Sequence, residues 1–292
     1  MVAVDFGPVL DALPEPTENA LNREVESMIV EPQVSGRETE APRRPGAPEG
    51  TPLPVWYVPP APSDAGGGGK APGLLVIQEA FGVNDHIRDV CLRFARLGYA
   101  VVSPDLYWRD GRWLRLGYDD FASARPLMAR LTEEAVLADL ETALDFLAAQ
   151  PEVDAERLGA VGYCMGGRLT WLLASRRPGR LRVAAVYYGG GIVPGLLPES
   201  GPAGLPREMP PLIGFFGGRD RSIPEAHVRR IDQVLEEAGV AHAIYFYPEA
   251  EHGFFCDQRP SFSARAAEDA WYRTRLWFGR HLPPAGAAAR PW

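Results

Sequence analysis

A cysteine set between glycines is the feature of this chain whose surroundings most clearly suggest chemistry. Residues 161–169 read VGYCMGGRL, with Gly162 and Gly166 each two positions from Cys164. The spacing is Gly-x-nucleophile-x-Gly, in which serine is the usual central residue. Glycines on both sides allow a turn tight enough to expose the central side chain. The pattern therefore indicates a cysteine nucleophile; the alternative is a buried structural thiol beside unrelated glycines.

The segments on either side of Cys164 predict that it lies between a strand and a helix. RLGAVGY, which precedes it, is typical of a strand, and CMGGRLTWLLAS is typical of a helix. A helix that begins at this point directs unpaired N–H groups at the sulfur. Such groups lower the pKa of a thiol and can hold an oxyanion. We therefore expect Cys164 at a strand–helix turn that favours nucleophilic attack.

Two further side chains could complete a nucleophile–acid–histidine set, and both follow predicted strands. Asp220 comes after PLIGFFGG, and His252 comes after AHAIYFY in the loop YPEAEHGFF. The chain order of nucleophile, acid and histidine fits this kind of turn, and such sites gather at the carboxyl ends of strands. A plain turn aspartate and a plain loop histidine are the alternatives. The other histidines lie in predicted helices, at a strand start or in the tail: His86, His227, His242 and His281.

From Leu74 onward, strand and helix patterns alternate along the chain. Short apolar runs such as LLVIQ are typical of strands buried on both faces. Thr132–Gln150 is predicted as a long amphipathic helix, and Ser222–Glu225 as a capping box that opens a later helix. This alternation predicts the α/β class, with a mostly parallel central sheet and helices on both faces.

The first part of the chain has a different composition, rich in Pro and Gly. Residues 1–72 are predicted to form an extended arm, with Glu24–Val30 and Leu53–Val58 as possible strands of a leading hairpin. Between them, Arg37–Glu49 is expected to be a long loop. The remainder is predicted to divide into one α/β domain and a short tail, residues 73–282 and 283–292.

Composition and charge argue against several classes of function and location for this protein. The chain has 292 residues, a formal net charge of −8 and three cysteines. Nucleic-acid binding favours clustered Lys and Arg, so we do not expect it. No run approaches the about 18 apolar residues of a membrane helix, and no secretory signal is visible. The cysteines lack the spacing of a disulfide framework or metal site. We expect a cytoplasmic monomer or homodimer without metal or organic cofactor.

Five separated blocks of the sequence together resemble the dienelactone hydrolase family. They follow one another in the family's order over about residues 73–280, and they are VIQEAFGVNDHIRD, VVSPDLYWR, VGYCMGG, GGRDRSIP and EHGFF. The family consists of α/β-hydrolases that use cysteine where related enzymes use serine. The resemblance therefore implies an α/β-hydrolase fold. It also implies hydrolysis of a small-molecule carboxylic ester or enol-lactone.

The resemblance implies roles for individual residues. Cys164 corresponds to the nucleophile, Asp220 to the orienting acid and His252 to the general base. Glu79 corresponds to an acidic residue beside the nucleophile, where it is expected to keep the resting thiol neutral. Without the resemblance, an ion pair with Arg88 is the simpler account of Glu79. The implied reaction is attack by the cysteine on the carbonyl, followed by hydrolysis of the thioester.

In such folds the oxyanion is held by the N–H after the nucleophile and by one from an earlier strand–helix loop. Here those groups belong to Met165 and Ala80. The name-giving substrates carry a carboxylate, and one arginine that holds it in the family follows the histidine by four positions. In this chain that position is Cys256. Arg259 and Arg125 are the candidates to replace it, or else they are solvated surface charges.

Several aromatic side chains are candidates for an apolar substrate pocket, although each could equally belong to the core. They are Tyr107, Trp108, Trp113, Phe81 and Phe254. Two other functions stay open at this point. One is a broad small-ester or thioester hydrolase unrelated to aromatic catabolism. The other is a catalytically silent ligand-binding protein on a hydrolase fold, which would have no need of a complete set of catalytic residues.

Overall fold

The structure is a computed structural model that describes residues 4–5, 34–43, 50–62, 69–195 and 208–284. Within these residues, nine strands form one sheet in the order β1-β9-β8-β7-β6-β4-β5-β3-β2. The strands are β1 (Val4–Asp5), β2 (Arg37–Ala41), β3 (Leu53–Val58), β4 (Ala71–Ile77), β5 (Ala100–Pro104), β6 (Val153–Tyr163), β7 (Val183–Tyr187), β8 (Leu212–Gly217) and β9 (His242–Tyr247). The helices are α2 (Asp85–Arg96), α3 (Phe121–Arg130), α4 (Glu133–Ala148), α5 (Met165–Arg176), α6 (Ile192–Gly195), α7 (Glu225–Glu237) and α8 (Ala264–His281).

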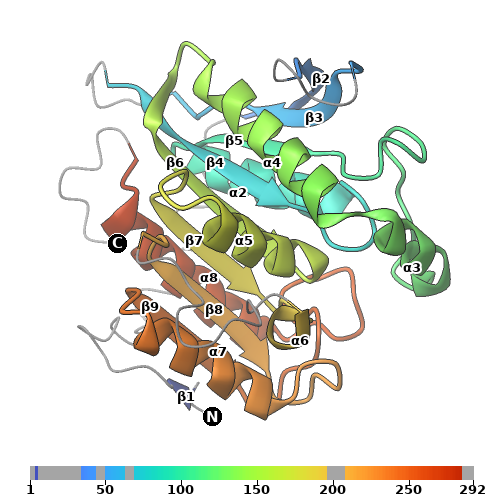
Figure 1. The fold of residues 1–292 in the computed structure, drawn as a ribbon, viewed down its shortest axis with the longest axis vertical. Coiled ribbons are helices and arrows are strands. Elements are labelled where there is room, and N and C mark those ends of the chain that lie inside the picture. Colours follow the sequence, from blue (N-terminus) through green and yellow to red (C-terminus); the bar gives the residue numbers. More distant parts are fainter. Residues whose placement is uncertain (1–3, 6–33, 44–49, 63–68, 196–207, 285–292) are drawn as a thin grey trace.

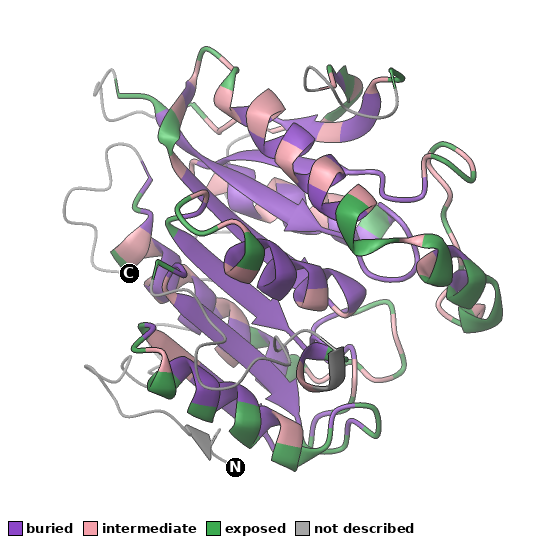
Figure 2. Ribbon diagram, viewed as in Figure 1, coloured by how far each residue is buried: buried purple, intermediate pink, exposed green. Residues whose placement is uncertain are grey.

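The six central strands, β5, β4, β6, β7, β8 and β9, run parallel, whereas β1, β2 and β3 pair antiparallel at the two edges. Helices α4, α5 and α7 cover the near face of the sheet in Figure 1, and α2 and α8 cover the far face. Strands β4, β5, β7 and β8 are buried along their whole length between these layers (Figure 2). The predicted α/β class is therefore confirmed.

The register of the parallel strands brings the candidate catalytic loops together. Ile77 at the end of β4 lies opposite Gly162 near the end of β6. Gly217 at the end of β8 lies opposite Tyr247 at the end of β9. Since each of these strands ends at the same edge, the loops that follow them meet there.

The N-terminal strands belong to the main sheet. β3 pairs with β5, and β2 pairs with β3. The prediction of a loop over Arg37–Glu49 is thus wrong for residues 37–41, which form β2, while the predicted strand Leu53–Val58 is β3. The charged, polar sequence RETEA hid this strand, because an edge strand needs no continuous apolar run. The predicted strand Glu24–Val30 lies outside the described residues.

Two helix starts differ from the sequence prediction. The predicted capping box at Ser222–Glu225 is wrong: α7 begins at Glu225 after Pro224, with no side-chain cap. Ser222 instead donates hydrogen bonds to Asp220. Helix α3 was not predicted; it contains Pro126, and Asp120 caps its first turn by accepting from the Ser123 N–H at 3.1 Å.

A buried carboxylate joins three distant parts of the fold. Asp139 on α4 is fully buried and accepts hydrogen bonds from Arg43 at 2.5 Å, Arg109 at 2.7 Å and the Trp108 indole at 3.2 Å. Arg43 follows β2, while Trp108 and Arg109 follow β5. Asp139 therefore fastens the N-terminal hairpin and the loop after β5 to α4.

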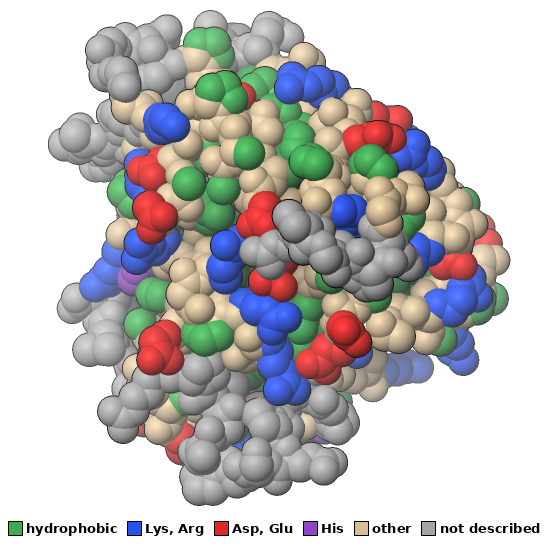
Figure 3. Space-filling view, turned by 45° about the horizontal axis from the view of Figure 1, so that its top comes forward, with side chains coloured by type: hydrophobic (Ala, Val, Ile, Leu, Met, Phe, Trp, Pro, Cys, Tyr) green, Lys and Arg blue, Asp and Glu red, His purple; other side chains and the backbone are tan. Residues whose placement is uncertain are grey.

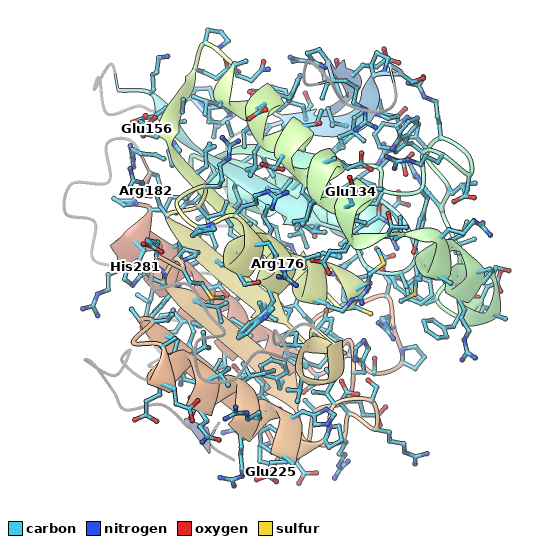
Figure 4. The ribbon with its side chains drawn as sticks, in the orientation of Figure 1. Glu134, Glu156, Arg176, Arg182, Glu225 and His281 are labelled. Carbon is cyan, nitrogen blue, oxygen red and sulfur yellow. The ribbon has the colours of Figure 1, made fainter. Side chains whose placement is uncertain are left out.

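The surface carries charges of both signs. Lys and Arg side chains lie among Asp and Glu side chains on the face shown in Figure 3. Glu156 and Arg182, labelled in Figure 4, approach to 3.9 Å near the amino ends of β6 and β7, away from the carboxyl ends of the strands. Among the described helices, none is long and apolar enough to cross a membrane.

Candidate active site

Cys164 occupies a strained turn between β6 and α5. Its backbone angles are φ 55° and ψ −115°, in a region that side chains other than glycine rarely adopt. A Cβ on Gly162 would overlap the Gly166 carbonyl, and a Cβ on Gly166 would overlap the Ile77 carbonyl. Glycine is therefore required at both positions. The structure has the strand–turn–helix arrangement that the sequence pattern predicted.

The structure brings Cys164, Asp220 and His252 together from three loops. His252 Nδ1 lies 2.6 Å from Asp220 Oδ2, and the His252 side chain also forms a hydrogen bond with the Cys164 side chain. Asp220 Oδ1 accepts from the Ser222 N–H at 2.8 Å and from its hydroxyl at 2.6 Å. The aspartate is thereby fixed by Ser222 and orients the imidazole toward the sulfur.

The electrostatics of the site favour a charged histidine. Burial raises the pKa of Asp220, but the hydrogen bonds from His252 and Ser222 outweigh it, so the pKa lies below the usual value. Burial lowers the pKa of His252, but the negative charge of the Cys164 thiolate and the hydrogen bonds to Asp220 and Cys164 outweigh it. The net effect raises the pKa of His252 to about 10.

The two predicted oxyanion donors lie in the loops beside Cys164. Met165 is the first residue of α5, so its N–H has no acceptor within the helix. Ala80 lies in the loop between β4 and α2. The hydroxyl of Tyr107, which is fully buried, donates to the Ala80 carbonyl at 2.9 Å and lies 3.7 Å from Met165 Sδ. Tyr107 thus supports this loop rather than lining the cavity, which was its predicted place.

Glu79 is fully buried at the end of β4 and pairs with Arg259, not with Arg88. Arg259 Nη1 lies 3.3 Å from Glu79 Oε1, whereas Arg88 binds Glu38 at 2.5 Å and stacks on Trp56. The role of Glu79 in keeping the resting thiol neutral stays a prediction.

Arg259 is held from several sides at the mouth of the cavity. Its guanidinium lies over the rings of Phe81 and Tyr118, 5.6 and 5.5 Å from their centroids. It also packs on Gly253 (φ 78°), where a Cβ would overlap it. With 16% of its side chain exposed, Arg259 is a fixed charge of the site and not a solvated surface charge.

The cavity above Cys164 has a volume of about 1240 Å³. Its walls combine aromatic and sulfur-containing side chains with four arginines. Phe81, Tyr118, Phe121 and Met128 form the apolar part, and four arginines supply positive charge: Arg168, Arg219, Arg221 and Arg259. Helix α3 is part of this wall, because its buried Ala124 packs on Ala80 and Phe81.

Three predicted substrate-binding residues lie elsewhere. Trp108 donates to Asp139, and the guanidiniums of Arg43 and Arg109 lie over its ring, so the ring is committed to that cluster. Phe254 is fully buried against Tyr188 and Tyr247. Arg125 is exposed on α3, with its guanidinium over the Phe121 ring. Placing these residues in the pocket was wrong: none of the three lines the cavity described here.

Sequence reasoning missed other residues of the site. Ser222 follows Asp220 by two positions, a spacing at which a serine can bond back to an aspartate. Arg168 follows Cys164 by four positions, one turn into α5, which could have been read from the helix period. Tyr118 and Phe121 gave no such signal, because only the tertiary fold carries their loop and α3 to the cavity.

A family model described as the dienelactone hydrolase family matches residues 60–282. The chain belongs to the dienelactone hydrolase family. A candidate carboxymethylenebutenolidase of Methylorubrum extorquens is 37% identical over 218 residues, which are 73% of this chain and 74% of that protein. Another from Escherichia coli K12 is 36% identical over 241 residues, covering 80% of this chain and 84% of that protein.

Solved structures agree with this membership. The crystal structure of a candidate dienelactone hydrolase from Klebsiella pneumoniae has a TM-score of 0.71 and 33% identity, and the match covers 85% of this chain and 99% of that one. The resemblance seen in the sequence is therefore confirmed, and the chain is a hydrolase of the dienelactone hydrolase family.

Proposed function

We propose that this hydrolase cleaves a carboxylic ester or an enol-lactone through a thioester on Cys164. The single observation that carries the proposal is the contact of Cys164 with a histidine that Asp220 holds at 2.6 Å. This is the geometry of a nucleophile, its base and an orienting acid. A protein retained only for ligand binding would have no need of all three.

In the proposed reaction, Cys164 Sγ attacks the carbonyl carbon. The carbonyl π electrons move to the oxygen, which accepts hydrogen bonds from the N–H groups of Ala80 and Met165. When the tetrahedral intermediate collapses, the carbon–oxygen bond to the leaving group breaks and His252 gives that oxygen its proton. His252 then takes a proton from water, whose oxygen attacks the thioester. When this second tetrahedral intermediate collapses, its carbon–sulfur bond breaks, the acid leaves, and Cys164 is regenerated beside the protonated His252.

Arg259 supports a substrate that carries a carboxylate. The relatives are named for a carboxymethylenebutenolide, a lactone with a carboxyl group. Cys256 replaces the family arginine at the position expected to hold such a group, but Arg259 lines the same cavity and is fixed against Phe81 and Tyr118. We propose that Arg259 binds the carboxylate and that Glu79 holds Arg259 in position.

The nucleophile is tested by hydrolysis of p-nitrophenyl acetate. Cys164→Ser is expected to reduce kcat/KM at least about 100-fold. Cys91→Ser is the matched control, since Cys91 is fully buried in the core on α2, and is expected to keep activity. In His252→Ala, an activated ester should still acylate Cys164, whereas hydrolysis of the thioester should be much slower. The acetyl group should then accumulate on Cys164 and be detected by intact-protein mass spectrometry. Full activity of Cys164→Ser would overturn the proposal.

The substrate class is tested by comparing that ester with a carboxylate-bearing dienelactone. Arg259→Gln is expected to raise KM for the dienelactone at least about tenfold and to change KM for the neutral ester much less. The double variant Glu79→Gln/Arg259→Gln removes the uncompensated buried carboxylate and controls for structural damage. Equal effects on both substrates would instead favour a broad hydrolase of small esters.

A further inference from the structure

A second group of reactive side chains lies behind the catalytic residues. Glu79, His86 and Cys256 each place one metal-ligating atom within 4.8 Å of the other two. They come from the end of β4, the first turn of α2 and the loop after His252. All three residues are buried.

The polar atoms of this group are incompletely paired. His86 is 1% exposed, and among the described residues neither of its ring nitrogens has a hydrogen-bond partner. Oε2 of the fully buried Glu79 also has none, because Arg259 engages only Oε1. Buried polar atoms are costly when unpaired, so two such groups facing one another indicate a missing partner.

The donor set selects the chemistry of that partner. A thiol, an imidazole and a carboxylate together match a borderline-soft cation, since thiolate and imidazole ligands favour zinc over magnesium or calcium. Asp257 adds to the match: its Oδ1 lies 3.9 Å from His86 Nδ1. A carboxylate behind a ligating histidine commonly orients the ring so that its other nitrogen faces the metal.

We propose that Glu79, His86 and Cys256 form a binding site for one Zn²⁺ ion, separate from the Cys164–His252–Asp220 group. Ligand atoms around tetrahedral zinc lie roughly 3.5 Å apart, so the three atoms need to approach by about 1 Å. The Cys256 thiol loses its proton to solvent when it binds. Its thiolate and the Glu79 carboxylate then balance the charge of the ion, and water completes the coordination.

The position of this site gives it a consequence for the enzyme. Glu79 precedes Ala80, whose N–H is the proposed oxyanion donor, and it holds Arg259 at the cavity. A zinc ion bound to Glu79 would therefore shift both the Ala80 N–H and the Arg259 guanidinium. The site lies close to solvent, because Asp257 beside His86 has half of its side chain exposed.

Zinc titration of untagged, chelator-treated protein tests the site, in the Cys164→Ser background so that the nucleophile is not a ligand. We expect saturable binding of one Zn²⁺ by calorimetry and none of Mg²⁺. Co²⁺ in place of Zn²⁺ should give a thiolate-to-cobalt charge-transfer band. Cys256→Ser should abolish the band, and both Cys256→Ser and His86→Gln should weaken zinc binding at least about tenfold.

Cys91→Ser is the matched control, because Cys91 is buried like Cys256 and lies on α2 like His86, but packs in the core. It should leave the band and the affinity unchanged. Circular dichroism establishes that each variant is folded. A band that survives Cys256→Ser, or the absence of saturable zinc binding and of the band in the parent Cys164→Ser protein, overturns the proposal; the parent measurement needs no second substitution to fold.

Discussion

At the scale of single residues, the contact between Cys164 and His252 determines how the site responds to pH. The pKa of His252 is raised to about 10, above the about 6.5 of an unfolded histidine. A raised pKa stabilises the fold fully below about pH 6.5, and the contribution is lost as pH rises through the folded value. The imidazole should therefore stay protonated at neutral pH.

Cys164→Ser removes the negative partner, so the pKa of His252 should fall. NMR titration of the His252 ring in both proteins measures this directly. The free energy of unfolding of wild type, relative to the variant, should decrease by at least about 1 kcal/mol between pH 6.5 and 10. A wild-type His252 that titrates near its ordinary value would contradict the ion pair.

The Tyr107 hydroxyl supports the loop that carries the proposed oxyanion donor Ala80. Tyr107→Phe removes the hydroxyl that donates to the Ala80 carbonyl, and the loop that carries the proposed oxyanion donor should loosen. We expect a loss of about 1 kcal/mol in the free energy of unfolding and a fall of several-fold in kcat with little change in KM.

The matched control for this change is Tyr163→Phe. Tyr163 is also fully buried and precedes Cys164 directly, but its hydroxyl has no hydrogen-bond partner among the described residues. It should leave kcat almost unchanged. If both variants lose activity equally, the Tyr107–Ala80 hydrogen bond has no special role.

At the scale of elements, helix α3 forms a wall of the cavity. Phe121 and Met128 on α3 line it, and Phe121 is 43% exposed. Phe121→Ala should raise KM for aryl esters about three- to tenfold while lowering the free energy of unfolding by only about 1 kcal/mol, because the residue is half-buried. Steady-state kinetics with phenyl and methyl esters separate the two effects.

Phe262→Ala provides the comparison, since Phe262 is exposed to 42% and does not line the cavity. Its KM values should match those of wild type. A KM for aryl esters that is unchanged in Phe121→Ala would remove α3 from substrate binding.

Elements whose pattern depends on neighbouring residues could be predicted from the sequence. The elbow at Cys164 and the strand ends before Asp220 and His252 were accessible, because glycine spacing and apolar runs depend on neighbouring residues. Helix α3 was not, since Pro126 interrupts its pattern and its burial depends on Ala80 and Phe81 from another loop. The pairing of Glu79 with Arg259 was also hidden, because these residues are far apart in the chain.

At the scale of the whole molecule, Asp139 connects the N-terminal hairpin, the loop after β5 and α4. Asp139→Ala leaves Arg43 buried without this counter-charge, its side chain being 7% exposed. We expect a loss of about 3–5 kcal/mol in the free energy of unfolding, measured by urea denaturation.

Glu134→Ala is the control on the same helix, because Glu134 is exposed (Figure 4). It should change the free energy of unfolding by less than about 0.5 kcal/mol. Similar losses in both variants would mean that Asp139 acts only through helix propensity. Contacts between residues far apart in the chain also explain why the predicted place of Trp108 was wrong. An aromatic residue near a strand end can line a pocket or pack on a buried ion pair, and the sequence alone does not distinguish the two.

The positive φ of Cys164 also bears on how such an enzyme could change over generations. A side chain held in this region costs the fold about 1–3 kcal/mol, which glycine would not incur. Cys164→Gly should therefore unfold at a higher temperature than wild type, or at least no lower, while losing all turnover. A lineage relieved of selection for the reaction would gain robustness by giving up its cysteine, so the site is preserved only while its chemistry is needed.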